Sequence, residues 1–194
     1  MRRIGRQASA QQGGFTLVEI MASIVVLAIV GLALSAYFIN ALDNAKGNQN
    51  KTVMVNLARN TLFYIQKQAD FKKIREQIDK LEDGQNFVLN SEGCSDTAHC
   101  SAYETYVSDP DSLTSILNPV INDIHYRVEI SYQESLYATL QSDVQSGGKI
   151  SDYLIPVRVE IEELTPDEEG NLVVSDQKRE KTEVEGYIAD EKIR

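Results

Sequence analysis

The sequence predicts an α+β fold in which one long N-terminal helix packs on a small antiparallel β-sheet. Three observations support this expectation. An unbroken apolar run opens the chain, apolar residues at helical spacing follow it, and the last third contains segments in which apolar and polar residues alternate. At 194 residues the chain is long enough for one compact domain with an extension, so we expect a single hydrophobic core.

The apolar run from Ile20 to Ile39 contains no charged side chain. As a helix that rises about 1.5 Å per residue, it would span roughly 30 Å, the hydrocarbon thickness of a bilayer. Arginines precede the run and Asp43 follows it, so the positive-inside bias places Met1 in the cytoplasm and the later residues outside. A cleaved secretory signal would have a shorter apolar region and a small-residue cleavage site. We therefore expect a single-pass protein of the cytoplasmic membrane with an extracytoplasmic C-terminal domain.

Charge is unevenly distributed along the chain. The first 14 residues contain Arg2, Arg3 and Arg6 and no acid, which leaves 16 basic and 29 acidic residues for the rest, a net charge of -13. Nucleic-acid binding draws its affinity from Lys and Arg that neutralise phosphates, and a strongly acidic body repels them. We therefore expect no direct nucleic-acid partner.

Residues 43–82 are expected to continue the helix in amphipathic form. Their apolar side chains recur at spacings of three and four in two stripes, which are Leu57, Ala58, Thr61, Leu62, Ile65 and Ala69, then Phe71, Ile74, Ile78 and Leu81. The stripe shifts near Asp70, so either one helix bends there or a second helix begins with Asp70 as its N-cap. In both cases we expect Gly84 to end the element.

The region 83–194 is expected to form the globular β domain. Residues 124–132 and 155–162 alternate between apolar and polar side chains, and 172–174 and 184–188 are two further candidate strands. Strands with one wet face favour antiparallel pairing. Pro156 predicts that its strand either has its first rungs there or lies at a sheet edge.

One short helix is expected between the candidate strands. Asp109 would cap it and Pro110 would occupy its first position, where a missing amide hydrogen costs nothing. Asn118 and Pro119 would close it.

Glu19 is out of place in a plain membrane anchor. It lies between Val18 and Ile20, and a carboxylate inside hydrocarbon costs on the order of 2 to 3 kcal/mol even on the mildest scale. A local explanation is a capping box, in which Thr16 caps the helix and Glu19, three residues later, reaches back to its amide. This local role is compatible with a further role of the carboxylate.

The stretch Gly13-Gly14-Phe15-Thr16-Leu17-Val18-Glu19-Ile20 resembles the processing motif of the type IV pilin and type II secretion pseudopilin superfamily. The resemblance covers about the first 40 residues and implies a pilin-like fold. It implies that a prepilin peptidase cuts between Gly14 and Phe15 and that the new Phe15 amine is methylated. It also implies that Glu19 meets the Phe15 amine of a neighbouring subunit as a fibre grows.

The resemblance implies a basic leader at 1–14 and a transmembrane or filament-core helix at 15–42, which precede the helical continuation at 43–82 and the globular domain at 83–194 that the residue patterns predict. Its partners would be the membrane, the prepilin peptidase, other pilin or pseudopilin subunits and their assembly machinery. Major members of the superfamily usually have proline at the position that matches Ala36, so alanine favours a minor subunit. The alternative is a non-assembling, single-pass anchored domain that binds a partner outside the cytoplasm.

Cys94 and Cys100 are the only cysteines. In an exported domain the oxidising compartment favours a disulfide between them. A metal site of Cys94, His99 and Cys100 is the less favoured alternative, because adjacent ligands in a short loop give poor tetrahedral geometry.

The acidic turn at 166–171 could hold calcium, with Asp176 as a further ligand. Its spacing does not match an EF-hand loop, so a solvated hairpin turn is the favoured interpretation.

No motif of a known catalytic class occurs in the sequence. We find no nucleophile elbow, no zinc-protease motif and no phosphate-binding glycine loop, and His99 and His125 are the only histidines. We expect neither an enzyme nor a bound cofactor or metal.

Overall fold

The computed structural model describes residues 14–82, 85–94, 100–142, 144–145, 148–174 and 181–193. The chain divides into two compact units, Met1–Lys46 and Gly47–Arg194, and each is described by itself. Helix α1 (Leu17–Gln68) begins in the first unit and ends in the second.

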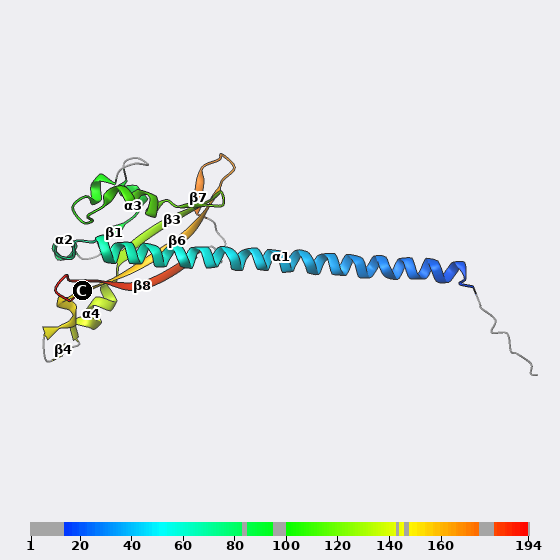
Figure 1. The fold of residues 1–194 in the computed structure, drawn as a ribbon, viewed down its shortest axis with the longest axis horizontal. Helices are drawn as coiled ribbons and strands as arrows, with labels where there is room; N and C mark the ends of the chain where they lie inside the picture. Colours follow the sequence, from blue (N-terminus) through cyan, green and yellow to red (C-terminus); the bar gives the residue numbers. More distant parts are fainter. Residues whose placement is uncertain are drawn as a thin grey trace, which may run out of the picture. The chain divides into compact units, whose positions relative to one another are not determined.

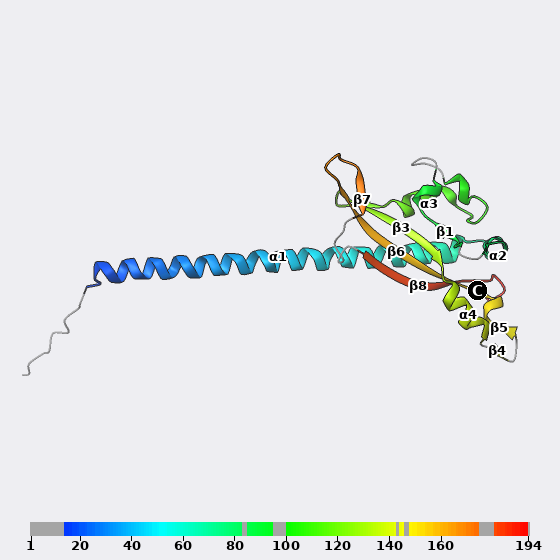
Figure 2. The ribbon, with the colours of Figure 1, turned by 180° about the vertical axis from the view of Figure 1, so that it is seen from behind.

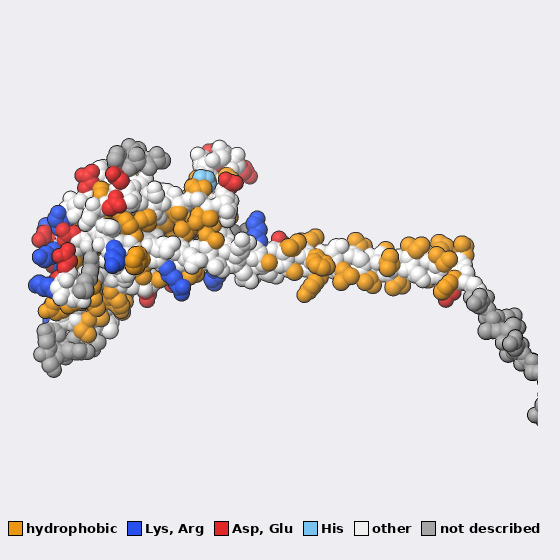
Figure 3. Space-filling model, viewed as in Figure 1, with side chains coloured by type: hydrophobic (Ala, Val, Ile, Leu, Met, Phe, Trp, Pro, Cys, Tyr) orange, Lys and Arg blue, Asp and Glu red, His pale blue; other side chains and the backbone are white. Residues whose placement is uncertain are grey.

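In the first unit α1 is apolar and exposed. Its large apolar side chains, from Leu17 to Leu42, are each at least half exposed, and Figure 3 shows hydrophobic side chains along this part of the helix. By length and composition α1 could cross a membrane. The helix continues without a break through Gly31 and Ala36, where the hydroxyl of Ser35 donates to the Gly31 carbonyl at 2.9 Å.

The second unit contains the predicted antiparallel sheet, and the α+β fold is confirmed. Its long strands are β3 (Ile124–Tyr132), β6 (Leu154–Pro166) and β8 (Lys181–Ala189), joined by β1 (Val88–Leu89), β2 (Val120–Ile121) and β7 (Leu172–Val174). The order is β1-β3-β6-β7, with β2 also on β3 and β8 also on β6. In Figures 1 and 2 the long strands run obliquely along the C-terminal part of α1.

One face of the sheet forms the core, as the alternation predicts. The inward side chains of β3 and β6 are buried, and α1 covers them with Met54, Ala58, Thr61 and Ile65. The opposite face carries cross-strand ion pairs, including Arg158 with Glu185 at 3.0 Å and Arg127 with Glu162. The two faces therefore differ as a half-solvated sheet requires.

Helix α1 approaches β8 closely at Gly186. A Cβ atom at this position would lie 2.6 Å from Cδ2 of Leu62, which is nearer than side-chain carbons pack. A larger residue here would therefore require the Leu62 side chain to shift.

Pro156 lies at the start of a central strand. It is the third residue of β6 and pairs with Tyr187 of β8, while β3 pairs with β6 from Val157 onward. Its carbonyl accepts the amide of Gln133 at 3.0 Å. The prediction that Pro156 lies at the start of its strand is confirmed. The alternative, that its strand lies at a sheet edge, is wrong because β6 has neighbouring strands on both sides.

Of the two alternatives at Asp70, a bend in one helix or the start of a second helix, the structure shows the start of a second helix. Helix α2 (Phe71–Ile78) begins there, and the Asp70 carboxylate accepts the amide of Lys73 at 3.1 Å. The helix ends at Ile78, and the amides of Lys80 and Leu81 then bind the carbonyls three residues back, of Gln77 and Ile78, at 3.1 Å each. The expectation that the element extends to Gly84 is therefore wrong, and Gly84 itself lies outside the described residues.

The short helix α3 (Pro110–Leu117) has the predicted caps. The Asp109 carboxylate accepts the Ser112 amide at 3.1 Å, Pro110 is in the first turn and Asn118 is the C-cap. The helical assignment and both of its boundaries are confirmed.

Helix α4 (Glu134–Ser142) was not expected from the sequence, nor was the pair β4 (Val144–Gln145) and β5 (Gly148–Lys149). No residue of α4 is fully buried. The guanidinium of Arg75 lies 4.7 Å from the Tyr137 ring centroid and donates to the Ser151 carbonyl at 2.9 Å. A long-range cation–π contact therefore helps to place this helix.

We expect alkaline pH to weaken the attachment of α1 to α3. The Tyr64 hydroxyl donates to the Asp109 carbonyl, and burial, followed by the charge of Asp109, raises the pKa of Tyr64 from 10.0 to about 12. The folded protein holds this proton more tightly than the unfolded chain, so the stabilisation is complete below pH 10 and is lost as the pH rises through about 12. In denaturant titrations, Tyr64→Phe should lose less stability over this range than the parent protein. The exposed Tyr187→Phe is the control, and equal losses in parent and Tyr64→Phe would contradict the prediction.

Candidate processing and assembly site

The candidate site lies where α1 begins. Gly14, Phe15 and Thr16 precede the helix, which starts at Leu17. Phe15 is 81% exposed, and a Cβ atom at Gly14 would have no neighbouring atom within 4 Å. The bond between Gly14 and Phe15 is therefore in an exposed, non-helical segment, whereas residues 1–13 lie outside the described part of the chain.

Thr16 caps the helix. Its hydroxyl accepts the Glu19 amide at 3.3 Å, and its carbonyl accepts the amides of Glu19 and Ile20 at 3.1 and 3.2 Å. These bonds satisfy amide groups that a helix start leaves without intrahelical partners. The Thr16 half of the capping box is therefore present.

The carboxylate of Glu19 is available for another contact. Glu19 is exposed, and within the described residues its carboxylate has neither a hydrogen bond nor an ion pair. The backbone of Glu19 is fully used, since its carbonyl also accepts the Ser23 hydroxyl at 2.7 Å. An anionic group therefore lies four residues after Phe15 on a helix surface that is otherwise apolar, where it could bind a cation.

These features define a class of protein: an α+β domain that carries one long apolar N-terminal helix suited to a single-pass membrane anchor. The comparisons with known proteins narrow this class. The prokaryotic N-terminal methylation motif matches residues 9–35. This part of the chain is a prepilin-type leader and helix of the type IV pilin and pseudopilin kind, which implies processing by a prepilin peptidase and association with pilin machinery in general. Neither the curated proteins nor the solved structures that were searched contain a match.

The two cysteines form a second feature, in the globular unit. Cys94 and Cys100 are joined by a disulfide, and Cys100 is fully buried with its sulfur 3.1 Å from the Thr114 hydroxyl. Tyr103 packs so closely on Gly93 that a Cβ there would lie 2.1 Å from the ring. The disulfide therefore ties two turns that also pack through a tyrosine. The enclosed residues 95–99, with His99, lie outside the described residues.

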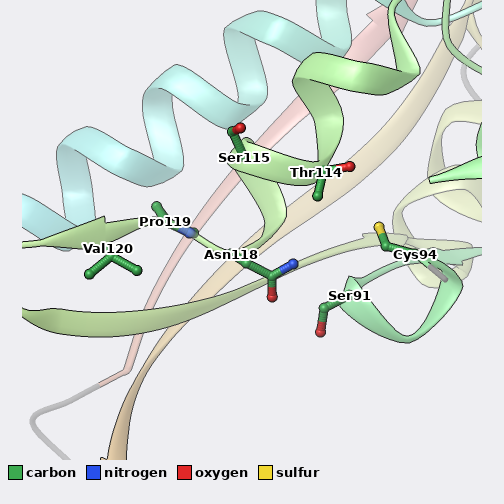
Figure 4. A pocket seen from close by; sticks show the side chains of 7 residues that line it. All are labelled: Ser91, Cys94, Thr114, Ser115, Asn118, Pro119 and Val120. Atoms are coloured by element: carbon green, nitrogen blue, oxygen red, sulfur yellow. The ribbon is translucent and has the colours of Figure 1, made fainter. Parts of the chain in front are cut away.

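A hollow of about 730 Å³ lies beside this disulfide. Figure 4 shows Ser91 and Cys94 on one side and Thr114 and Ser115 of α3 on the other. Asn118, Pro119 and Val120 complete the lining. None of these lining residues is charged, so the described part of the hollow offers no group for acid–base chemistry.

The acidic turn at 166–171 joins β6 to β7 as a hairpin. The Asp167 carboxylate accepts the amides of Asn171 and Glu169 at 2.8 and 2.9 Å, and these bonds, led by the one from Asn171, hold the pKa of Asp167 below its ordinary value. Gly170 supplies the required left-handed conformation with φ at 84°. The described residues contain no group of three or more potential metal ligands, and Asp176 lies outside them.

Proposed function

We propose that this chain is the precursor of a pilin-like subunit that assembles into a pilus or a secretion pseudopilus. The match of residues 9–35 to the N-terminal methylation motif carries the proposal. The role assigned to the protein is structural rather than catalytic, and it requires no cofactor.

The first step is removal of the leader by a prepilin peptidase between Gly14 and Phe15. Gly14 has open space around its Cα, which lets a protease approach the backbone, and Phe15 is exposed. The new amino group of Phe15 is then methylated. Cleavage occurs on the cytoplasmic side, because the arginine-rich N-terminus stays inside and the acidic domain is exported.

The second step transfers the apolar helix from the bilayer to the core of a fibre. The Glu19 carboxylate then binds the Phe15 amine of a neighbouring subunit. Opposite charges about 4 Å apart attract by about 4 kcal/mol at an effective dielectric near 20, which offsets the desolvation of the carboxylate. The absence of a competing partner for this carboxylate within the described residues supports the step.

The finer assignment is a minor subunit, present in few copies. Its support is Ala36, which occupies the position where major subunits of the superfamily usually have proline. Helix α1 continues without interruption there, as expected for a residue that retains its amide hydrogen. The acidic domain makes direct binding of DNA by this subunit unfavourable.

One observation favours a second candidate function. Because the Thr16 cap stabilises the helix start locally, a plain membrane anchor could also keep these residues. The chain would then be a non-assembling, single-pass extracytoplasmic binding domain whose Gly14–Phe15 bond stays intact.

The experiment that separates these functions is the intact mass and N-terminal sequence of the protein purified from membranes of its own host. A start at Phe15 with one added methyl group is expected. A start at Met1 would contradict the proposal and leave the anchored binding domain.

A further inference from the structure

Three polar side chains meet where α1 first contacts the sheet. Within the unit 47–194, Asn50 is the first residue of α1 that is partly buried, and Met54, one turn later, is the first that is fully buried. The Tyr126 hydroxyl donates to the Asn50 side-chain carbonyl, and the Asn50 amide group donates to the Glu163 carboxylate. Both functional groups of the Asn50 side chain are therefore bonded to the sheet.

The strand register places the other two groups side by side. Tyr126 of β3 and Glu163 of β6 are direct cross-strand partners, and both point to the helix-covered face. Burial, followed by the charge of Glu163, raises the pKa of Tyr126. Glu163 therefore continues the inward row of Val157, Val159 and Ile161 with a carboxylate.

The hydrogen bonds of Asn50 lie one helical turn before Met54, where the fully buried apolar contact of α1 with the sheet begins. Asn50 and Glu163 are half-buried, so their hydrogen bonds can be exchanged for hydrogen bonds to water. Val53, which is partly buried, packs against the core, but Met54 is fully buried, so separating Met54 and the residues after it would expose more apolar surface. The segment 48–53 can therefore leave the sheet at lower free energy than the rest of the docked helix.

We propose that Asn50, Tyr126 and Glu163 form a releasable clamp. When it is closed, segment 48–53 of α1 is bound to the sheet, and when it opens, this segment is free. Asn50 is its positioning residue. The use of the clamp during fibre growth rests on the proposed function: release of segment 48–53 would free about two further helical turns for contacts with neighbouring subunits. The clamp itself belongs to the fold and exists whether or not the chain assembles.

The test is amide hydrogen exchange of the full-length protein in detergent. Asn50→Leu removes both bonds at similar volume. It should accelerate exchange of residues 48–53 by about tenfold to a hundredfold, because helical turns that lose their attachment to the sheet open more readily and one lost partner is a carboxylate. Exchange of residues 58–68 and of β3 and β6 should stay unchanged. Glu163→Gln keeps an acceptor oxygen for Asn50 and should retain most of the protection.

The matched control is Asn56→Leu, which alters an exposed asparagine of the same helix. If Asn50→Leu does not fold, Tyr126→Phe is used instead, and a smaller acceleration confined to residues 48–53 is expected. Unchanged exchange in that segment, or equal acceleration throughout the unit, would overturn the clamp. Incorporation into fibres is measured separately in the host: an intact clamp in a chain that is never cut or assembled would refute the proposed function alone.

Discussion

Replacing Gly14 with valine should leave the protein as an uncut precursor. A branched side chain next to the scissile bond would keep the protease from the close backbone approach that glycine allows, and a displacement of about 1 Å in such a complex lowers the rate by about a hundredfold. The folded domain should be unaffected, because a Cβ at Gly14 has no neighbour within 4 Å. Intact mass of the membrane fraction reports the ratio of precursor to cut protein.

Gly31→Val is the matched control for this experiment. Gly31 also has open space around its Cα, but it lies within the apolar helix and away from the proposed cleavage site. It should be cut as the parent protein is. Normal cleavage of Gly14→Val would contradict the assignment of this bond, even if the chain proves to be processed elsewhere.

Replacing Glu19 with alanine should abolish assembly and leave membrane insertion intact. Removing one partner of a buried ion pair costs about 3 to 5 kcal/mol, which corresponds to a loss of at least a hundredfold in incorporation. Insertion should be as good or better, because the substitution removes the cost of a carboxylate in hydrocarbon. The helix start should persist, since the Thr16 cap binds the backbone amide of residue 19 and not its side chain.

The measurement for Glu19→Ala is the amount of cut protein in sheared fibres relative to the amount in membranes. Asp43→Ala is the control, because Asp43 is an acid of the same helix that lies beyond the apolar run. Normal incorporation of Glu19→Ala would support the anchored binding domain. Failure of Glu19→Ala to enter the membrane would instead show that the carboxylate acts during insertion.

Local signals account for the elements that could be predicted. The alternation in 124–132 defines which face of β3 is buried, because a strand turns its side chains to opposite faces with a period of two. The caps of α3 follow from Asp109 and Pro110, whose preferences depend on their own backbone bonds. The residues of the processing and assembly site lie within one short segment. Because no long-range contact is needed to bring them together, the sequence alone predicts that they are neighbours in space.

The contact of Glu163 with Asn50 was not predicted, although the sequence contains a weak indication of it. Glu163 falls on the inward row of β6, where the alternation expects an apolar side chain, and this break in pattern could have indicated a buried polar partner. Its partner Asn50 is 113 residues away, and no local rule joins the two.

The sequence by itself thus determined the long apolar helix, the position of the processing motif, the main strands and their inward faces. These depend on side-chain type and spacing within single segments. Only the tertiary structure decided that β6 is central, that α4 forms, that Leu62 lies against Gly186 of β8 and that Asn50 meets Tyr126 and Glu163. The physical reason is that each of these depends on contacts between residues far apart in the chain, and such contacts exist only once the helix and the sheet have packed together.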